Sequence, residues 1–327
     1  MRPCLVECME QASGTGAEAA IRTRGLTRYF RTKPAVLDMG FRVERGTVCS
    51  ILGRNGSGKT TTMRLLLGLL PPTRGRCWLL GEESTRLRPE TRARVGYLPE
   101  GLPLRPGVRV RQLQAHQARC WKHWNPEVYR SIVHHFDIDP GSKTNQLSRG
   151  QRAGLCLALA LAPEPELLIL DEPTLGLDQV AHRAVLEALV HFAQQRGNTV
   201  FIATHQLHDA ERISDQLIIM DGGTVRASCS PETLLCRVRA YNLIFDTAPP
   251  PRGPLKIRGL LELSRSDRSL RLVLADPDAD ALTRIRDLGA SAVRESELGL
   301  QEAVTAFMAR TRQSEAAPAD TSAPLWR

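Results

Sequence analysis

Aromatic side chains and long apolar runs are both scarce in this sequence of 327 residues. Phenylalanine, tyrosine and tryptophan make up 5% of the chain, which argues against a protein that works mainly by stacking nucleic-acid bases. The longest uninterrupted apolar run covers the eight residues 155–162, whereas a membrane-spanning helix needs about 20. We therefore expect a chain without a membrane-spanning segment.

A secretory signal and a cysteine pattern typical of metal sites are also missing. Residues 1–20 contain charged residues and no apolar stretch, so we interpret them as a flexible N-terminal arm and expect a cytoplasmic protein. The eight cysteines are scattered, and their closest pair, Cys4 and Cys8, is followed by no second pair at zinc-finger spacing. We expect these thiols to be reduced and not to bind zinc.

Lysine is rare as well, although the chain is basic. Its net charge of +9 comes from 39 arginines and only 5 lysines against 35 acidic residues. A basic balance can indicate a nucleic-acid or anionic-lipid partner. Here the arginines are spread along the chain without a compact basic block, which favours solvated faces, and no nucleic-acid partner is expected.

A glycine-rich segment directly follows the strand-like run 47–52. Its G-x-x-x-x-G-K-T pattern, between a strand and a helix, matches a phosphate-binding loop. Glycines let the backbone curl around a polyphosphate, and the helix after them presents its positive N-terminal end. Lys59 would reach the β- and γ-phosphates, and the Thr60 hydroxyl would bind magnesium. The residues expected to bind nucleotide here are Gly53, Arg54, Asn55, Gly56, Ser57, Gly58, Lys59, Thr60 and Thr61.

Two adjacent carboxylates, Asp171 and Glu172, follow the apolar run 167–170. In open α/β sheets, ligands bind at the carboxyl ends of the strands. Acidic residues at the end of a core strand are costly unless a cation or water uses them. Asp171 would then hold magnesium, and Glu172 would be the general base that polarises the attacking water.

Strand-like runs alternate with helical segments along most of the chain, which predicts an α/β fold with a mostly parallel sheet. After residue 239 the composition changes, and residues 240–312 are predicted to form a small α+β domain followed by a disordered tail, 313–327. The expected elements of this small domain are strands at 255–263 and 268–275, a helix at 281–288 and a last helix carrying Leu300, Val304, Phe307 and Met308.

The segment Leu147-Ser148-Arg149-Gly150-Gln151 resembles the signature motif of ABC ATPases. Motif order and spacing are similar to this family from about residue 21 to 230. The resemblance implies an ATPase domain over 21–239, comprising a mostly parallel core sheet, an antiparallel β subdomain and a helical subdomain at about 101–162. Two positions depart from the usual pattern: Arg149 stands where Gly is common, and Glu100 where Gln is common.

The resemblance also implies roles for further residues. Tyr29 resembles the aromatic that stacks on adenine, although it could be a packing residue and Phe30 competes with it. Glu100 occupies the magnesium-binding place of the Q-loop, and His205 that of the switch histidine, which acts in catalysis with Glu172. The remaining nucleotide-binding positions, which would contact ATP held by a second subunit, are Ser148, Gly150, Gln151 and Asp178.

The family implies an ATP-binding and ATP-hydrolysing subunit that uses Mg²⁺. The pattern is similar to the drug- or polysaccharide-exporter class, in which two ATPase subunits, here two copies of one chain, power export through a separate membrane-spanning subunit. Such a subunit would lie on the inner face of the cell membrane. Trp121 and Trp124 would either line the docking groove or belong to the core. The alternative is a soluble ABC ATPase acting on nucleic acid or ribosomes, supported only by the net charge.

Overall fold

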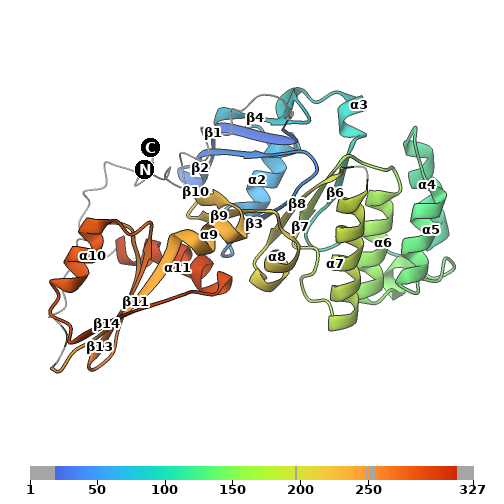
Figure 1. Ribbon diagram of the computed structural model, residues 1–327. Coiled ribbons are helices and arrows are strands. Elements are labelled where there is room, and N and C mark those ends of the chain that lie inside the picture. Colours follow the sequence, from blue (N-terminus) through green and yellow to red (C-terminus); the bar gives the residue numbers. More distant parts are fainter. Residues whose placement is uncertain (1–18, 196, 248, 250–254, 256, 315–327) are drawn as a thin grey trace.

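A computed structural model describes residues 19–195, 197–247, 249, 255 and 257–314, with three sheets and the helices around them (Figure 1). The expected N-terminal arm and C-terminal tail lie outside this part of the chain, apart from residues 19, 20, 313 and 314. None of the helices it describes is both long and apolar enough to cross a membrane.

The central sheet has six strands in the order β10-β9-β3-β8-β7-β6. All neighbouring strands are parallel except β10, which runs antiparallel to β9. Most of its side chains are buried because both faces are covered, one by helices and the other by the helix Lys59–Leu66 together with a second sheet. The strand bounds are β3 Val48–Gly53, β6 Val95–Leu98, β7 Leu167–Asp171, β8 Thr199–Thr204, β9 Gln216–Asp221 and β10 Thr224–Cys229.

A second sheet, fully antiparallel, lies at the top of Figure 1 in blue and cyan. Phe41 of this sheet stacks on Phe201 of β8 with ring centroids 6.0 Å apart, which joins the two sheets in one core. Its order is β2-β1-β4-β5, with β1 Ile21–Phe30, β2 Lys33–Val43, β4 Arg74–Leu79 and β5 Glu82–Glu83. The short helix α3, Pro89–Arg92, follows it, and α2, Lys59–Leu66, begins directly after the glycine-rich loop.

The chain between strands β6 and β7 contains the helical part of the fold. Asn125 accepts hydrogen bonds from the first turn of α5, and Ser148 does the same for α6, so polar caps define where both helices begin. Trp124 packs on Tyr129 in this helical core. The helices are α4 Val110–Cys120, α5 Pro126–His135 and α6 Arg149–Leu161, followed later by α7 Gln179–Gln194, α8 Leu207–Ile213 and α9 Pro231–Arg237.

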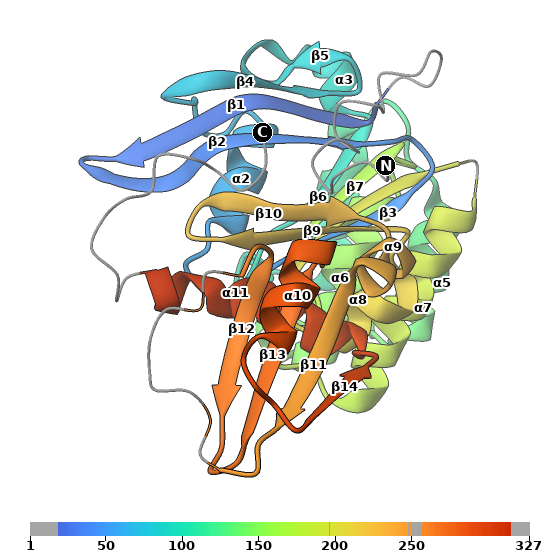
Figure 2. The ribbon, with the colours of Figure 1, turned by 60° about the vertical axis from the view of Figure 1, so that its left-hand side comes forward.

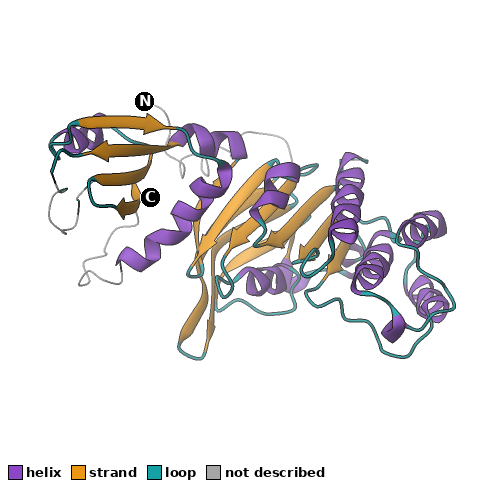
Figure 3. Cartoon of the chain, turned by 90° about the horizontal axis from the view of Figure 1, so that it is seen from below, coloured by secondary structure: helices purple, strands orange, loops and turns teal. Residues whose placement is uncertain are grey.

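The C-terminal sheet has the order β12-β13-β11-β14 and is packed between two helices. Helix α10 covers one face, and α11 lies between the other face and the central sheet (Figures 2 and 3). Val304 and Phe307 of α11 belong to the same buried cluster as Ile219 of β9. The elements are β11 Val238–Ile244, β12 Leu260–Arg265, β13 Ser269–Ala275, α10 Ala279–Arg286, β14 Ala292–Ser296 and α11 Leu300–Ser314.

The α/β fold class is therefore confirmed, including the antiparallel and helical parts. The predicted strand at 255–263 begins only at Leu260, because residues 258 and 259 form a turn. Strands β4, β5, β6, β10, β11 and β14 were not predicted. The small C-terminal unit also shares its core with the central sheet through α11.

Candidate functional site

The loop between β3 and α2 has the backbone shape that a phosphate needs. Gly56 and Gly58 have φ angles of 83° and 104°, in the left-handed region that favours glycine. A Cβ atom on Gly58 would also lie 2.3 Å from the carbonyl oxygen of Ala35. Helix α2 begins at Lys59, so the positive end of its dipole faces the loop.

Lys59 lies beneath this loop with 6% of its side chain exposed. Its ammonium donates a hydrogen bond to the Gly53 carbonyl at 2.8 Å and forms an ion pair with Glu172 Oε1 at 3.3 Å. The cation expected to hold phosphate is thus paired with a carboxylate of its own chain.

Glu172 connects Lys59 to His205. It follows β7 with a left-handed φ of 50°, an uncommon conformation for a residue with a side chain. Its Oε2 lies 2.7 Å from His205 Nδ1, and the His205 backbone N–H donates to the same oxygen at 3.4 Å. Since a carboxylate only accepts, the hydrogen bond assigns the proton to Nδ1. The two catalytic candidates are therefore hydrogen-bonded to each other.

Asp171 is fully buried, and neither of its carboxylate oxygens accepts a hydrogen bond of ordinary geometry from the described residues. Burial raises its pKa above the usual value; the nearby Thr60 hydroxyl opposes this rise, and the charges of Glu100 and Glu172 add to it. A buried carboxylate whose charge is so weakly compensated is suited to a cation. Within the described chain no three His, Cys, Asp or Glu side chains form a metal cage, so a cation here would also need hydroxyl and phosphate oxygens.

These groups surround a pocket of about 360 Å³. Gly53, Ser57 and Asp171 lie buried outside its lining. Ala35 and Leu175 also line the pocket, and the sequence offered no signal for either. The predicted residues that line it are Arg54, Asn55, Gly56, Gly58, Lys59, Thr60, Thr61, Glu100, Glu172 and His205.

The signature residues do not line this pocket of their own chain. Ser148 Oγ accepts a hydrogen bond from the Gln151 N–H at 3.1 Å, and Gln151 Oε1 accepts one from the Ser148 N–H at 3.0 Å. This reciprocal capping box forms the N-terminus of α6, which starts at Arg149 with Gly150 next. Asp178 caps α7 in a similar way, accepting from the N–H groups of residues 180 and 181.

Neither aromatic candidate for adenine lines the pocket. Tyr29 is half-buried in β1, and its backbone N–H donates to Thr73 Oγ1 at 3.1 Å. Phe30 is 47% exposed, with the Arg28 guanidinium 5.1 Å from its ring centroid. Adenine stacking by Tyr29 or Phe30 stays a prediction.

The unusual Arg149 lies against the turn that follows Glu172. A Cβ atom on Gly176, whose φ is 68°, would be 2.6 Å from the Arg149 guanidinium carbon. Arg149, Arg152 and Glu172 line a second hollow of about 300 Å³. The departure from the family pattern thus adds a cation beside Glu172, the candidate general base.

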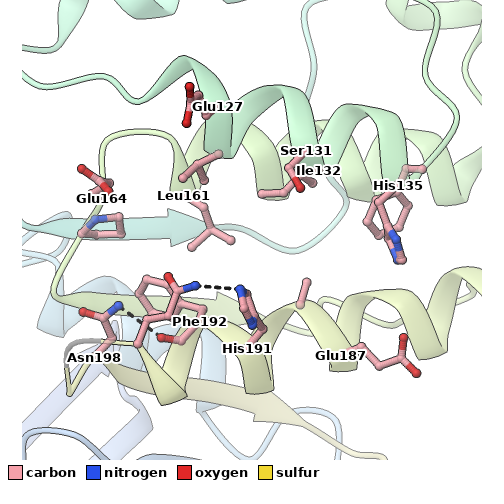
Figure 4. Close-up of a pocket in the computed structure, with 15 residues that line it drawn as sticks. Glu127, Ser131, Ile132, His135, Leu161, Glu164, Glu187, His191, Phe192 and Asn198 are labelled. Atoms are coloured by element: carbon pink, nitrogen blue, oxygen red, sulfur yellow. Dashed lines mark hydrogen bonds between the residues drawn. The ribbon is translucent and has the colours of Figure 1, made fainter.

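Two other hollows have no phosphate-binding character. One of about 500 Å³ lies between α5 and α7, where Ile132, Leu161 and Phe192 form an apolar wall (Figure 4). Among its described lining residues there is no lysine or arginine. The other, about 280 Å³, lies beside β6 and is lined by Trp121, whereas Trp124 packs in the helical core.

Comparisons with known proteins identify the family of this chain. Residues 36–175 match the ABC transporter family. The Nod factor export ATP-binding protein I of Paraburkholderia xenovorans (strain LB400) is 33% identical over 244 residues, covering 72% of this chain and 78% of the relative.

Solved structures show the same fold. An ATP-binding subunit of an ABC transporter superposes with a TM-score of 0.60 at 27% identity, covering 66% of this chain and 91% of that one. The dimeric bacterial ABC transporter cassette MJ0796 reaches 0.58 at 21% identity, covering 64% of this chain and 98% of its own. Fold, site geometry and sequence similarity together lead to one conclusion: the chain belongs to the ATP-binding proteins of the ABC transporter family.

Proposed function

We propose that this chain hydrolyses ATP to power export through a separate membrane-spanning subunit. The observation that carries the proposal is the series Lys59–Glu172–His205 at a glycine-rich loop, in which Lys59 and Glu172 are buried, because these are groups that phosphoryl transfer to water requires. Similarity to proteins named for Nod factor export supports export as the direction of transport.

Hydrolysis follows from the chemistry of the pocket. The loop amides and Lys59 would bind the β- and γ-phosphates of ATP and stabilise charge on the transferred group. Glu172 would then accept a proton from the attacking water, with His205 Nδ1 holding its second oxygen in place. Thr60, Asp171 and Glu100 offer oxygen ligands for Mg²⁺, which when bound would neutralise phosphate charge.

Dimer closure by ATP is the proposed source of force. The signature Ser148 and Asp178 are exposed away from the chain's own pocket, and Val180 beside them is 81% exposed, which is unusual for an apolar side chain. A second copy facing these residues would bring the α6 N-terminus, an anion-binding end, to its neighbour's ATP. ATP would then favour the closed dimer, since it binds that state better, and hydrolysis would release it.

The membrane partner would bind in the groove beside β6. Trp121, Leu104 and Leu159 give this groove an apolar lining, and it lies next to Pro99, which precedes the pocket residue Glu100. A partner helix seated there would sense the nucleotide through that short connection. This arrangement would hold the subunit at the inner face of the cell membrane.

Dimer closure is tested by sedimentation velocity of Glu172→Gln with and without ATP. We expect dimer with ATP and monomer without it, because this variant binds ATP but cannot hydrolyse it. Lys59→Ala is the control and should remain monomeric in both cases. A Glu172→Gln protein that stays monomeric at millimolar ATP would contradict the proposed closure.

Docking is tested by placing a photocrosslinking residue at Trp121 in native membranes. We expect an adduct with a polytopic membrane protein, and none from the exposed Arg119, which lies in the last turn of α4 just before Trp121. Turnover stimulated by RNA or DNA in a salt-sensitive manner, without such an adduct, would favour the soluble alternative.

A further inference from the structure

A second polar cluster lies behind the catalytic pair. Asp209 is only 2% exposed, yet its Oδ2 accepts two hydrogen bonds: from Thr174 Oγ1 at 3.2 Å and from His182 Nε2 at 2.9 Å. The same His182 nitrogen lies 3.0 Å from Gln206 Oε1. Since both oxygens accept, this geometry assigns the proton to Nε2, which donates to both. The three side chains Thr174, His182 and Asp209 are called here the Asp209 clamp.

The clamp joins the two turns that carry the catalytic residues. Thr174 lies two residues after Glu172, and Gln206 directly follows His205. His182 is in the first turn of α7 and Asp209 in the first turn of α8, which are neighbouring helices (Figure 1). The Asp209 carboxylate thus fixes the turn after β7 and both helices at one point.

Buried polar networks of this kind hold geometry tightly. Thr174 is 1% exposed, so its hydroxyl and the Asp209 carboxylate interact away from water, where hydrogen bonds are stronger and unpaired groups are costly. The Glu172 backbone N–H donates a hydrogen bond to the Ala203 carbonyl oxygen of β8 at 2.9 Å. After Glu172 the chain turns away from β8. The clamp restrains the turn beyond this bend.

We propose that Asp209 is a positioning residue for ATP hydrolysis, holding the Glu172 turn against the His205 turn through Thr174 and His182. The proposal rests on the proposed function, because it concerns how well Glu172 is aimed at water. Displacing a catalytic group by about 1 Å can lower a rate on the order of a hundredfold. ATP binding would change little, because the loop amides and Lys59 are not part of the clamp.

Asp209→Ala and Asp209→Asn test the proposal in steady-state phosphate release. We expect kcat to fall on the order of tenfold to a hundredfold for Asp209→Ala and less for Asp209→Asn, with KM within about threefold of wild type. Glu211→Gln, an exposed carboxylate on the same helix, is the matched control and should leave kcat unchanged. Activity is measured well below the Tm of each variant, so that a loss of stability alone would not lower kcat.

Thr174 gives an independent test that does not depend on removing a buried charge. Thr174→Val removes only the hydroxyl and should lower kcat severalfold, and Thr174→Ser should restore it. In Thr174→Val/Asp209→Ala the two losses should not add, because both break the same clamp.

Normal kcat in Asp209→Ala, or additive losses in the double variant, would overturn the inference. A lowered Tm with unchanged kcat at low temperature would likewise assign the clamp a purely structural role. Both outcomes leave the proposed function intact. A wild-type chain that releases no phosphate from ATP would instead refute the proposed function itself.

Discussion

Removing the Glu172 carboxylate should tighten ATP binding to the isolated chain. This carboxylate forms an ion pair with the Lys59 ammonium and so competes with phosphate for it. The Lys59 ammonium lies 3.3 Å from Glu172 Oε1, with both side chains over nine-tenths buried. At an effective dielectric of about 20, attraction over this distance is about 5 kcal/mol. When ATP binds, phosphate replaces Glu172 as the partner of Lys59, while Glu172 keeps its hydrogen bond to His205. Much of the lost attraction is therefore recovered, and we expect the net cost of breaking the ion pair to be about 1.5–3 kcal/mol.

Glu172→Gln should therefore bind ATP about tenfold to a hundredfold more tightly. The assay is titration with a fluorescent ATP analogue in EDTA at low protein concentration, which excludes metal and dimer effects. Glu100→Gln is the matched control: it removes a charge from the same pocket but no ion pair, and its gain should stay below about threefold. Equal gains in both variants, or none for Glu172→Gln, would refute the reasoning.

Three further predictions concern stability and binding. Burial raises the pKa of Asp171, so its charge destabilises the metal-free protein at neutral pH, and wild type regains this stability as pH falls through that pKa. Asp171→Asn should thus raise the Tm in EDTA at pH 7, by the equivalent of about 1–3 kcal/mol, with a smaller gain near pH 4; a lower Tm at pH 7 would be contrary to this. Gly58→Ala should abolish binding of the ATP analogue, because the added Cβ would collide with the Ala35 carbonyl oxygen. Gly107 also has a left-handed φ, 76°, but open space around it, so Gly107→Ala should bind the analogue normally. Ser148→Ala should lower the Tm, because losing the cap of α6 costs about 1 kcal/mol of stability. Ser148→Asp should keep the Tm but lose ATP-driven dimerisation. An unchanged Tm in Ser148→Ala would argue against the cap.

The sequence predicted the parts of the site that are contiguous in the chain. The loop 53–60 and the strand before Asp171 combine residue type, spacing and local structure in one short segment, so both were recognisable. His205 and the signature helix followed from the family pattern. The structure adds that Lys59, Glu172 and His205 form one hydrogen-bonded and ion-paired series.

Features that depend on distant segments could not be predicted in this way. Strand β6 has only four residues, and so short an apolar run does not distinguish strand from helix. Strand β14 is an edge strand with an exposed middle, so its sequence lacks hydrophobic alternation. Asp209 meets Thr174 across 35 residues, and only the parallel packing of β7 and β8 brings them together.

The most direct test of the whole account is isothermal titration calorimetry of the wild-type chain with ATP at millimolar Mg²⁺. The heat of binding is recorded before hydrolysis contributes. We predict a saturable heat of one ATP per chain, which disappears in Lys59→Ala. Absence of any saturable heat from the folded wild-type chain would contradict the assignment of a nucleotide site to the loop 53–60.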